Sequence, residues 1–180
     1  MSTTAVRRSC LLAAAFTLVS GVAWAANPHF VGQVRNLGIA SDGSDTVTGK
    51  VGGLDSLATV QIKAAADVAA LFACKINGGG FTSDPKTQTI TGKKTIGQTF
   101  RQQNGQATFD LTLQLSSGLT CPNGQQKVLA CIEYDNKRAS FATQSGKFGQ
   151  QKATVPSSAQ KIFFSRFTNE CKELFANSQG

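Results

Sequence analysis

The sequence predicts a mainly β protein: a single antiparallel β-sandwich domain with a short helix at its C-terminal end. Three observations predict this class. Apolar and polar residues alternate with a period of two over two long segments, which places them on opposite faces of a strand. Turn-forming pairs such as Asn-Gly and Asp-Pro separate the strand-like segments. Four cysteines follow a secretory signal, as is typical of an exported, disulfide-bonded domain.

The N-terminal segment has the three parts of a cleavable signal peptide. Arg7 and Arg8 supply positive charge, Cys10–Val19 is an uncharged apolar run, and Ala23-Trp24-Ala25 ends the segment with small residues. The apolar run is shorter than the roughly 20 residues that a membrane-spanning helix needs. We therefore expect export and no transmembrane segment.

Cleavage is expected after Ala25 or Ala26, which divides the chain into a signal peptide, residues 1–26, and one domain, residues 27–180. The pattern leaves open Sec or twin-arginine export, and a secreted or periplasmic location. Loss of the signal leaves 16 basic against 10 acidic residues, a net charge of +6, and removes the only tryptophan. This charge favours an acidic polymer or a cell surface as the partner.

Four cysteines remain after cleavage: Cys74, Cys121, Cys131 and Cys171. An even number in an exported chain indicates two disulfides. Of the three possible pairings we expect Cys74–Cys121 with Cys131–Cys171, because the first two lie where strands run into loops and Cys171 lies in a tail that Cys131 could hold. No pair has C-x-x-C spacing and the only histidine is His29, so neither a metal site nor a cofactor is expected.

Two segments carry the clearest strand pattern: Val60 to Ile76, and Thr108 to Leu115. The alanine-rich centre of the first also suits a helix, but alternation on both sides of it favours one strand, bent or bulged midway. Gln103–Gln106 has the composition of a tight hairpin turn. The further expected strands are Phe30–Arg35, Thr46–Val51, Thr87–Phe100, Lys127–Tyr134 and Arg138–Thr143.

The C-terminal part of the chain has a different character. The polar stretch Gln144–Ser158 is expected to form a long loop or an irregular edge. The aromatic run Lys161–Phe167 is expected to pack as a last strand rather than to form a membrane or partner patch. Thr168 to Asn177 then predicts a short helix, with Glu170 in its first turn.

The residues that catalysis needs are scarce in this sequence. His29 would lie near the mature N-terminus, where chain ends are mobile, so no serine triad is expected. Ser41–Asp45 lacks the twelve-residue calcium pattern and is expected to be a plain turn. The acids are expected on solvated turns or outward strand positions, as at Asp42, Asp45, Asp84 and Asp110. We expect no enzyme; a carboxylate-dependent hydrolase is the least favoured alternative.

Binding of a ligand or surface outside the cytoplasm is the expected function. The basic residues are spread along the chain, with clusters at Lys93-Lys94, Lys137-Arg138 and Lys161/Arg166. Stacking aromatics are few, with Tyr134 as the only tyrosine, so specific nucleic-acid binding is not expected. A structural envelope or fimbrial-type component is the alternative.

Two loops are the candidate binding sites, because loops at disulfide-tied strand ends form a rigid frame for recognition. They span Asn77–Asp84 and Cys121–Gln126. The candidate residues are Asn77, Phe81, Asp84, Asn123 and Gln125.

Several short motifs resemble a group of small secreted, functionally uncharacterised bacterial proteins. The motifs are His29-Phe30-Val31-Gly32, Gly49-Lys50-Val51-Gly52-Gly53-Leu54, Cys74 with Asn77-Gly78-Gly79, and Leu119-Thr120-Cys121-Pro122-Asn123-Gly124-Gln125. The resemblance covers roughly residues 29–135. It implies an immunoglobulin-like β-sandwich and a Cys74–Cys121 bond, but not the second disulfide. It carries over no catalytic residue.

Overall fold

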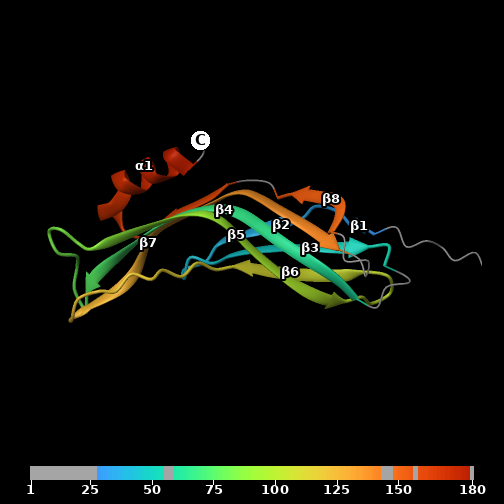
Figure 1. Cartoon of the computed structure of the whole chain (residues 1–180), viewed down its shortest axis with the longest axis horizontal. Coiled ribbons are helices and arrows are strands. Elements are labelled where there is room, and N and C mark those ends of the chain that lie inside the picture. The colour runs from blue at the N-terminus through green and yellow to red at the C-terminus, as the bar shows by residue number, and fades with distance from the viewer. Residues whose placement is uncertain (1–27, 55–58, 143–147, 156–157, 179–180) are drawn as a thin grey trace, which may run out of the picture.

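The computed structural model describes residues 28–54, 59–142, 148–155 and 158–178. The predicted signal peptide lies outside these residues. The described chain forms two antiparallel sheets and one short C-terminal helix (Figure 1), as the sequence predicts at this level. No helix in the described ranges is long and apolar enough to span a membrane.

The first sheet, called sheet A, is built around one central strand. Strand β3 (Asp45–Gly52) pairs along one edge with β6 (Ala107–Leu113). Its other edge pairs first with β2 (Arg35–Ile39) and further along with β1 (His29–Phe30). The predicted single strand Phe30–Arg35 is therefore wrong. The chain turns between β1 and β2 at Gly32, whose φ of 68° is a left-handed conformation that glycine adopts readily.

The second sheet, sheet B, contains the longest strands. Its order is β5 (Thr87–Arg101), β4 (Thr59–Ile76), β7 (Gln125–Ala142) and β8 (Phe148–Thr154). A short strand, β9 (Ala159–Ile162), pairs with β7 along the same edge as β8. Of the two alternatives predicted for Gln144–Ser158, the long loop is wrong for the described residues 148–154, which form β8. The irregular edge is confirmed there, because β8 is an edge strand of sheet B and its register with β7 shifts between Ser140 and Ala142.

Strand β4 confirms the strand interpretation of the alanine-rich segment. Its even-numbered residues from Val60 to Phe72 enter the core between the sheets. Its odd-numbered residues Ala69, Leu71 and Ala73 are buried on the other face. Small alanine side chains suit this segment because both of its faces are covered.

Strand β7 is one strand where the sequence predicted two. Asp67 of β4 pairs with Asp135, and Ala65 pairs with Arg138, so β7 has one extra residue between these pairs. This bulge contains Asn136, which has a φ of 47°. A bulge reverses which residues of the strand face inward, and Lys137 consequently points into the core.

The main core lies between the two sheets. It joins residues of β3 and β6 to the inner faces of β4 and β7. Phe30 packs edge to face against Phe109 of sheet A and Phe141 of sheet B, with centroid distances of 6.3 Å and 5.1 Å. The sheets are also linked covalently through the chain by the β5–β6 hairpin. Its turn has the two backbone bonds expected between Gln103 and Gln106, which confirms the predicted tight turn.

A second, smaller core lies on the outer face of sheet B beneath the C-terminal helix. Helix α1 (Thr168–Ser178) follows a short 3₁₀ turn, η1 (Ser165–Phe167), and crosses over β4 and β7 (Figure 1). Its buried residues Cys171 and Phe175 contact the outer-face residues of those strands. The aromatic residues before the helix pack into the two cores, Phe163 into the first and Phe164 and Phe167 into the second. The prediction that Lys161–Phe167 forms a last strand is wrong beyond Ile162, where β9 ends and the chain turns into η1.

Both disulfides have the predicted pairing. Cys74 bonds to Cys121 across a sequence separation of 47 residues. Cys131 of β7 bonds to Cys171 of α1 across 40 residues and fastens the helix to sheet B.

Candidate functional site

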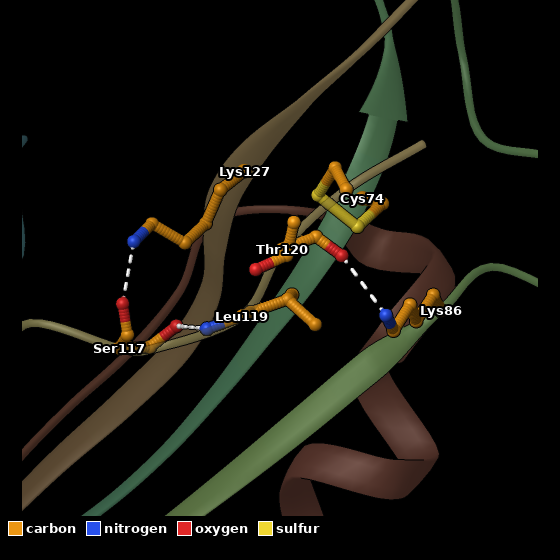
Figure 2. The surroundings of a disulfide bond; sticks show 7 residues. Cys74, Lys86, Ser117, Leu119, Thr120 and Lys127 are labelled. Carbon is orange, nitrogen blue, oxygen red and sulfur yellow. Dashed lines mark hydrogen bonds between the residues drawn. A yellow bond between two sulfur atoms is a disulfide. The ribbon is translucent and has the colours of Figure 1, made fainter. Parts of the chain in front are cut away.

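The two predicted binding loops meet at one end of sheet B. The Asn77 N–H donates to the Gly124 carbonyl at 3.0 Å. Figure 2 shows the Cys74–Cys121 bond beside this junction, with the Lys86 ammonium donating to the Thr120 carbonyl at 3.0 Å. A backbone hydrogen bond thus joins the two loops, and the disulfide fastens the second loop to the end of β4.

The candidate residues of these loops do not form one concave site. Asn77, Asp84 and Asn123 are exposed, whereas Gln125 is half-buried. Asp84 lines a cleft beside α1, but the other three line none of the clefts described below.

Phe81 has a packing role in the structure. Its ring stands edge to face against Phe164 and Phe167, with centroid distances of 5.1 Å and 4.9 Å. The ring is half-buried against the core beneath α1. The part of Phe81 that a ligand could stack on is therefore largely used within the protein.

Most of the basic residues in the three clusters noted in the sequence make contacts within the protein. Lys137 is completely buried, which contradicts its expected surface position. Lys161 donates to the carbonyls of Ile39 and Ala40, and Arg166 donates to the Ser83 carbonyl at 2.6 Å. These cations consequently have little capacity left for a ligand.

A different group of cations gathers on the outer face of sheet A. Arg35 of β2 lies opposite Thr48 of β3, and Lys50 is two residues further along β3. Residues in this diagonal relation share a face and lie about 7–8 Å apart at their Cα atoms. Lys50 in turn lies opposite Thr108 of β6. The register thus places the first two cations side by side, pointing away from the core.

Two adjoining shallow clefts on this face bring in the third cation, Arg101. One cleft, of about 490 Å³, contains Arg35 and Lys50. The other, of about 460 Å³, contains Lys50 and Arg101. Lys50 and Thr108 line both clefts, so the three cations border one continuous surface, which we call the basic face. The other polar side chains along it are Gln33, Thr48, Gln103, Asn104 and Gln106.

The three cations of the basic face have no ion pair or side-chain hydrogen bond with any described residue. The ion pairs formed within the described ranges are Lys93–Asp67 and Lys137–Asp45. No acid lines either cleft. Asp110 lies on the same outer face, opposite Thr48, but borders neither cleft. Arg35, Lys50 and Arg101 are all exposed, so their charges are available to a ligand.

The clefts beside α1 differ from those on the basic face, because some of their charged groups have partners within the protein. A cleft of about 490 Å³ lies between sheet B and the end of the helix, and one of about 390 Å³ lies between the helix and the start of β5. In the first, Asp67 accepts a hydrogen bond from Asn136 at 3.1 Å and lies 3.9 Å from the Lys93 ammonium. Nearby, the buried Glu133 accepts hydrogen bonds from Gln160 and Ser178.

The carboxylates that line the clefts beside α1 are Asp67 and Asp135 in the first cleft, and Asp84 with Glu170 of α1 in the second. Asp67 and Asp135 both line the first cleft, but they are cross-strand neighbours on one wall. The helix wall contributes Leu174, Asn177 and Ser178. Among the described residues, no group of three or more His, Cys, Asp and Glu side chains could hold a metal ion.

The turn Ser41–Asp45 uses its acids within the protein. Asp42 accepts hydrogen bonds from the Ser44 hydroxyl and N–H, at 2.7 Å and 3.0 Å, and these bonds lower the pKa of its carboxyl. This is the plain turn that the sequence predicted. Asp45, however, is fully buried, so its expected position on a solvated turn or outward face is wrong. It faces inward because it occupies the same side of β3 as Val47.

Tyr134 is also buried rather than available for stacking. Its hydroxyl lies 2.9 Å from the Gly43 carbonyl and 3.1 Å from the Leu113 carbonyl, which links β7 to sheet A. Burial, followed by the charges of Asp45 and Asp42, raises the pKa of Tyr134 above its ordinary range. The hydroxyl therefore serves as a hydrogen-bond donor inside the fold.

Sequence reasoning did not single out the basic face. Arg35, Lys50 and Arg101 are separated by 15 and 51 positions in the chain, and no two are adjacent. The sequence did indicate that each of the three lies in a predicted strand or directly after one. The strand pairing that joins them was not available from alternation alone.

No protein-family model matches the chain, and searches of curated proteins and of solved structures find no match.

Proposed function

We propose that this protein is an exported, non-enzymatic binding protein that holds an acidic polysaccharide of a cell surface on its basic face. The observation that carries the proposal is the set of three unpaired, exposed cations bordering two continuous clefts. The loops Asn77–Asp84 and Cys121–Gln126 are the rival site.

Electrostatics favours an anionic ligand at this position. Arg35, Lys50 and Arg101 repel one another, and no acid in the clefts offsets that repulsion. An anionic polymer would relieve it and release bound counterions, which strengthens binding at low salt. The surplus positive charge of the predicted mature chain acts in the same direction at longer range.

The uncharged side chains of the basic face favour a polysaccharide over a lipid surface. Amides and hydroxyls such as Gln33, Gln103 and Thr108 supply both donors and acceptors for sugar hydroxyls. Insertion into a membrane needs several exposed apolar side chains. Along the two clefts the exposed large apolar side chain is Val31. The two clefts also adjoin along Lys50 and Thr108, which provides a continuous surface for a polymer.

The strand pairing supports an immunoglobulin-like assignment. In that fold the second strand pairs with the first and the fifth, and the third pairs with the sixth. Here β3 pairs with β2 and β6, while β4 pairs with β5 and β7, and β7 with β8. The same order arises if β2 to β8 are the successive strands of such a domain. In that count β5 is the fourth strand, and it pairs beside the third, β4, in sheet B. The two disulfides support the exported location, because such bonds persist in oxidising compartments.

Assembly into a fimbrial-type polymer is less well supported. Strand β5 is an edge of sheet B, 15 residues long, and offers an edge for strand addition. Lys93 and Lys94 lie at its centre, however, and lysine on an edge strand discourages pairing with another chain. Sedimentation of the mature protein as a monomer would exclude the polymer.

The test measures binding of the mature protein to three immobilised probes: dextran sulfate, polygalacturonate and vesicles containing phosphatidylglycerol. We expect binding to at least one polysaccharide, weakening steadily as salt is added. The substitution R35Q/K50Q/R101Q should weaken it on the order of 100-fold, since each cation near an anionic surface contributes about 1 kcal/mol.

The matched control is K93Q/R138Q/K172Q, which removes the same charge from the side of the molecule that carries α1. It should weaken binding by only a few-fold. Equal losses in the two variants would show that net charge, rather than the basic face, determines binding. Retention on vesicles alone would replace the polysaccharide with a lipid surface, and binding to none of the probes would contradict the proposal.

A further inference from the structure

The core between the sheets contains an isolated pair of oppositely charged side chains. The Lys137 Nζ lies 3.1 Å from the Asp45 Oδ2, and both side chains have 0% exposure. Lys137 belongs to β7 of sheet B and Asp45 to β3 of sheet A. The two groups therefore meet across the interface of the two sheets, 92 residues apart in the chain.

Local structure directs both side chains inward. The bulge at Asn136 changes the alternation of β7, so that Lys137 shares the inner face with Ala139 and Phe141. Asp45 precedes Val47 on the inner face of β3 and lies opposite Leu113 of β6. Both side chains are therefore shielded from bulk solvent.

The pair is poorly satisfied as two ions. A lysine ammonium has three donors, and the one hydrogen bond found for Lys137 is to Asp45. The Asp45 Oδ1 has no hydrogen-bond partner. A buried ion pair needs further hydrogen bonds to offset its desolvation. Burial accordingly raises the pKa of Asp45, although the hydrogen bond and charge of Lys137 oppose the shift. The environment of Asp45 thus favours its neutral carboxylic acid.

We propose that Lys137 and Asp45 form an intramolecular amide (isopeptide) bond in the mature protein. The ammonium first passes a proton to the carboxylate, which leaves a free amine beside a carboxylic acid. The Nζ lone pair then attacks Cγ, a new C–N bond forms, and a carboxyl oxygen leaves as water with two protons. The step needs no oxidant, reductant or co-reactant. It converts two buried charges into one neutral amide.

The geometry is close to what such a reaction requires. Reacting groups held about 3–3.5 Å apart in fixed orientation gain a large effective concentration. Strands on either side of the core hold the Lys137 Nζ 3.1 Å from the Asp45 Oδ2, an oxygen bonded directly to the Cγ that would be attacked. The Tyr134 hydroxyl, bound to the carbonyls of Gly43 and Leu113, fixes the same end of the two sheets.

The bond would add a constraint that the disulfides do not supply. Cys74–Cys121 ties β4 to the segment before β7, and Cys131–Cys171 ties β7 to α1. Neither joins a strand of sheet A to a strand of sheet B. The proposal does not depend on the proposed binding function.

Mass spectrometry of the unaltered protein tests the proposal directly. After reduction, alkylation and trypsin digestion, an amide at Lys137 blocks cleavage there. We expect one branched peptide in which residues 36–50 are joined to residues 128–138, with a mass one water below the sum of the two. Recovery of both segments as separate linear peptides, with cleavage after Lys137, would overturn the proposal.

Two variants keep the result independent of folding defects. K137R keeps the positive charge but cannot form the lysine amide, and D45A removes the carboxyl carbon. The branched peptide should be absent from both. The intact mass of K137R should equal the mass calculated without loss of water. A branched peptide in either variant would place the link on other residues and contradict the assignment.

Discussion

The outer faces of the two sheets differ in whether their charged side chains have partners within the protein. On sheet B, α1 covers the apolar part of the face, and Asp67 beside it has partners in Asn136 and Lys93. On sheet A, none of the described helices covers the face, and Arg35, Lys50 and Arg101 lie along open clefts without an ion pair or side-chain hydrogen bond to any described residue. Both faces are built on antiparallel strands.

The difference separates residues that hold the fold from residues free to bind. Groups that are paired or buried contribute to stability, and changing them should move the free energy of unfolding. Unpaired, exposed charges on the outer face of sheet A contribute little to stability. Changing them should alter binding and leave unfolding almost unaffected.

The largest expected effect comes from releasing the helix from sheet B. The substitution C131S/C171S removes the bond that closes a 40-residue separation, and the simple chain model predicts a loss of about 4 kcal/mol. Urea unfolding measures this loss. Binding to dextran sulfate, at a temperature where the variant is folded, should be unchanged. A parallel loss of binding would indicate that the helix side carries the ligand.

A smaller loss of stability is expected at Phe81. F81A removes a half-buried ring packed on Phe164 and Phe167, and we expect about 2–3 kcal/mol, somewhat below the value for a fully buried ring. F81L is the control that keeps most of the apolar volume. Unfolding measures the change in stability and a titration measures the affinity. Unchanged stability with lost binding would restore Phe81 to the predicted binding loop.

The smallest effect is expected from single acids, and it is a gain. D110N removes the acid on the outer face of sheet A, so the affinity for an anionic polysaccharide should rise about three- to five-fold, close to 1 kcal/mol. D84N makes the same change on the predicted loop beside α1 and should have little effect. Titration at one fixed salt concentration compares them. A larger gain in D84N than in D110N would favour the loops as the site.

Much of the fold could be predicted, because alternation and local turn chemistry act over short distances. Val60–Ile76 and the turn at Gln103–Gln106 were predicted for that reason. The disulfide pairing was also correct. Strand β8 was predicted only as a long loop or an irregular edge, because residues 148–154 are polar and weakly alternating and are held in place by pairing with β7.

The candidate site depended on features that the sequence does not display locally. One extra residue at Asn136 turns Lys137 from the surface into the core, and alternation gives no sign of a bulge. The inward face of β3 likewise takes Asp45, which a rule based on polarity places outside. Arg35, Lys50 and Arg101 come together only through the register of β2, β3 and β6 and the hairpin that precedes β6.

Mapping the binding surface tests the central claim most directly. Short dextran sulfate chains would be titrated into isotope-labelled mature protein while backbone amide shifts are followed by NMR. We predict that the largest shifts occur at residues 31–35, 48–50 and 101–108, with small shifts at 77–84 and 121–126. The largest shifts in the two loops or along α1, with the strands of sheet A unchanged, would contradict the assignment of binding to the basic face.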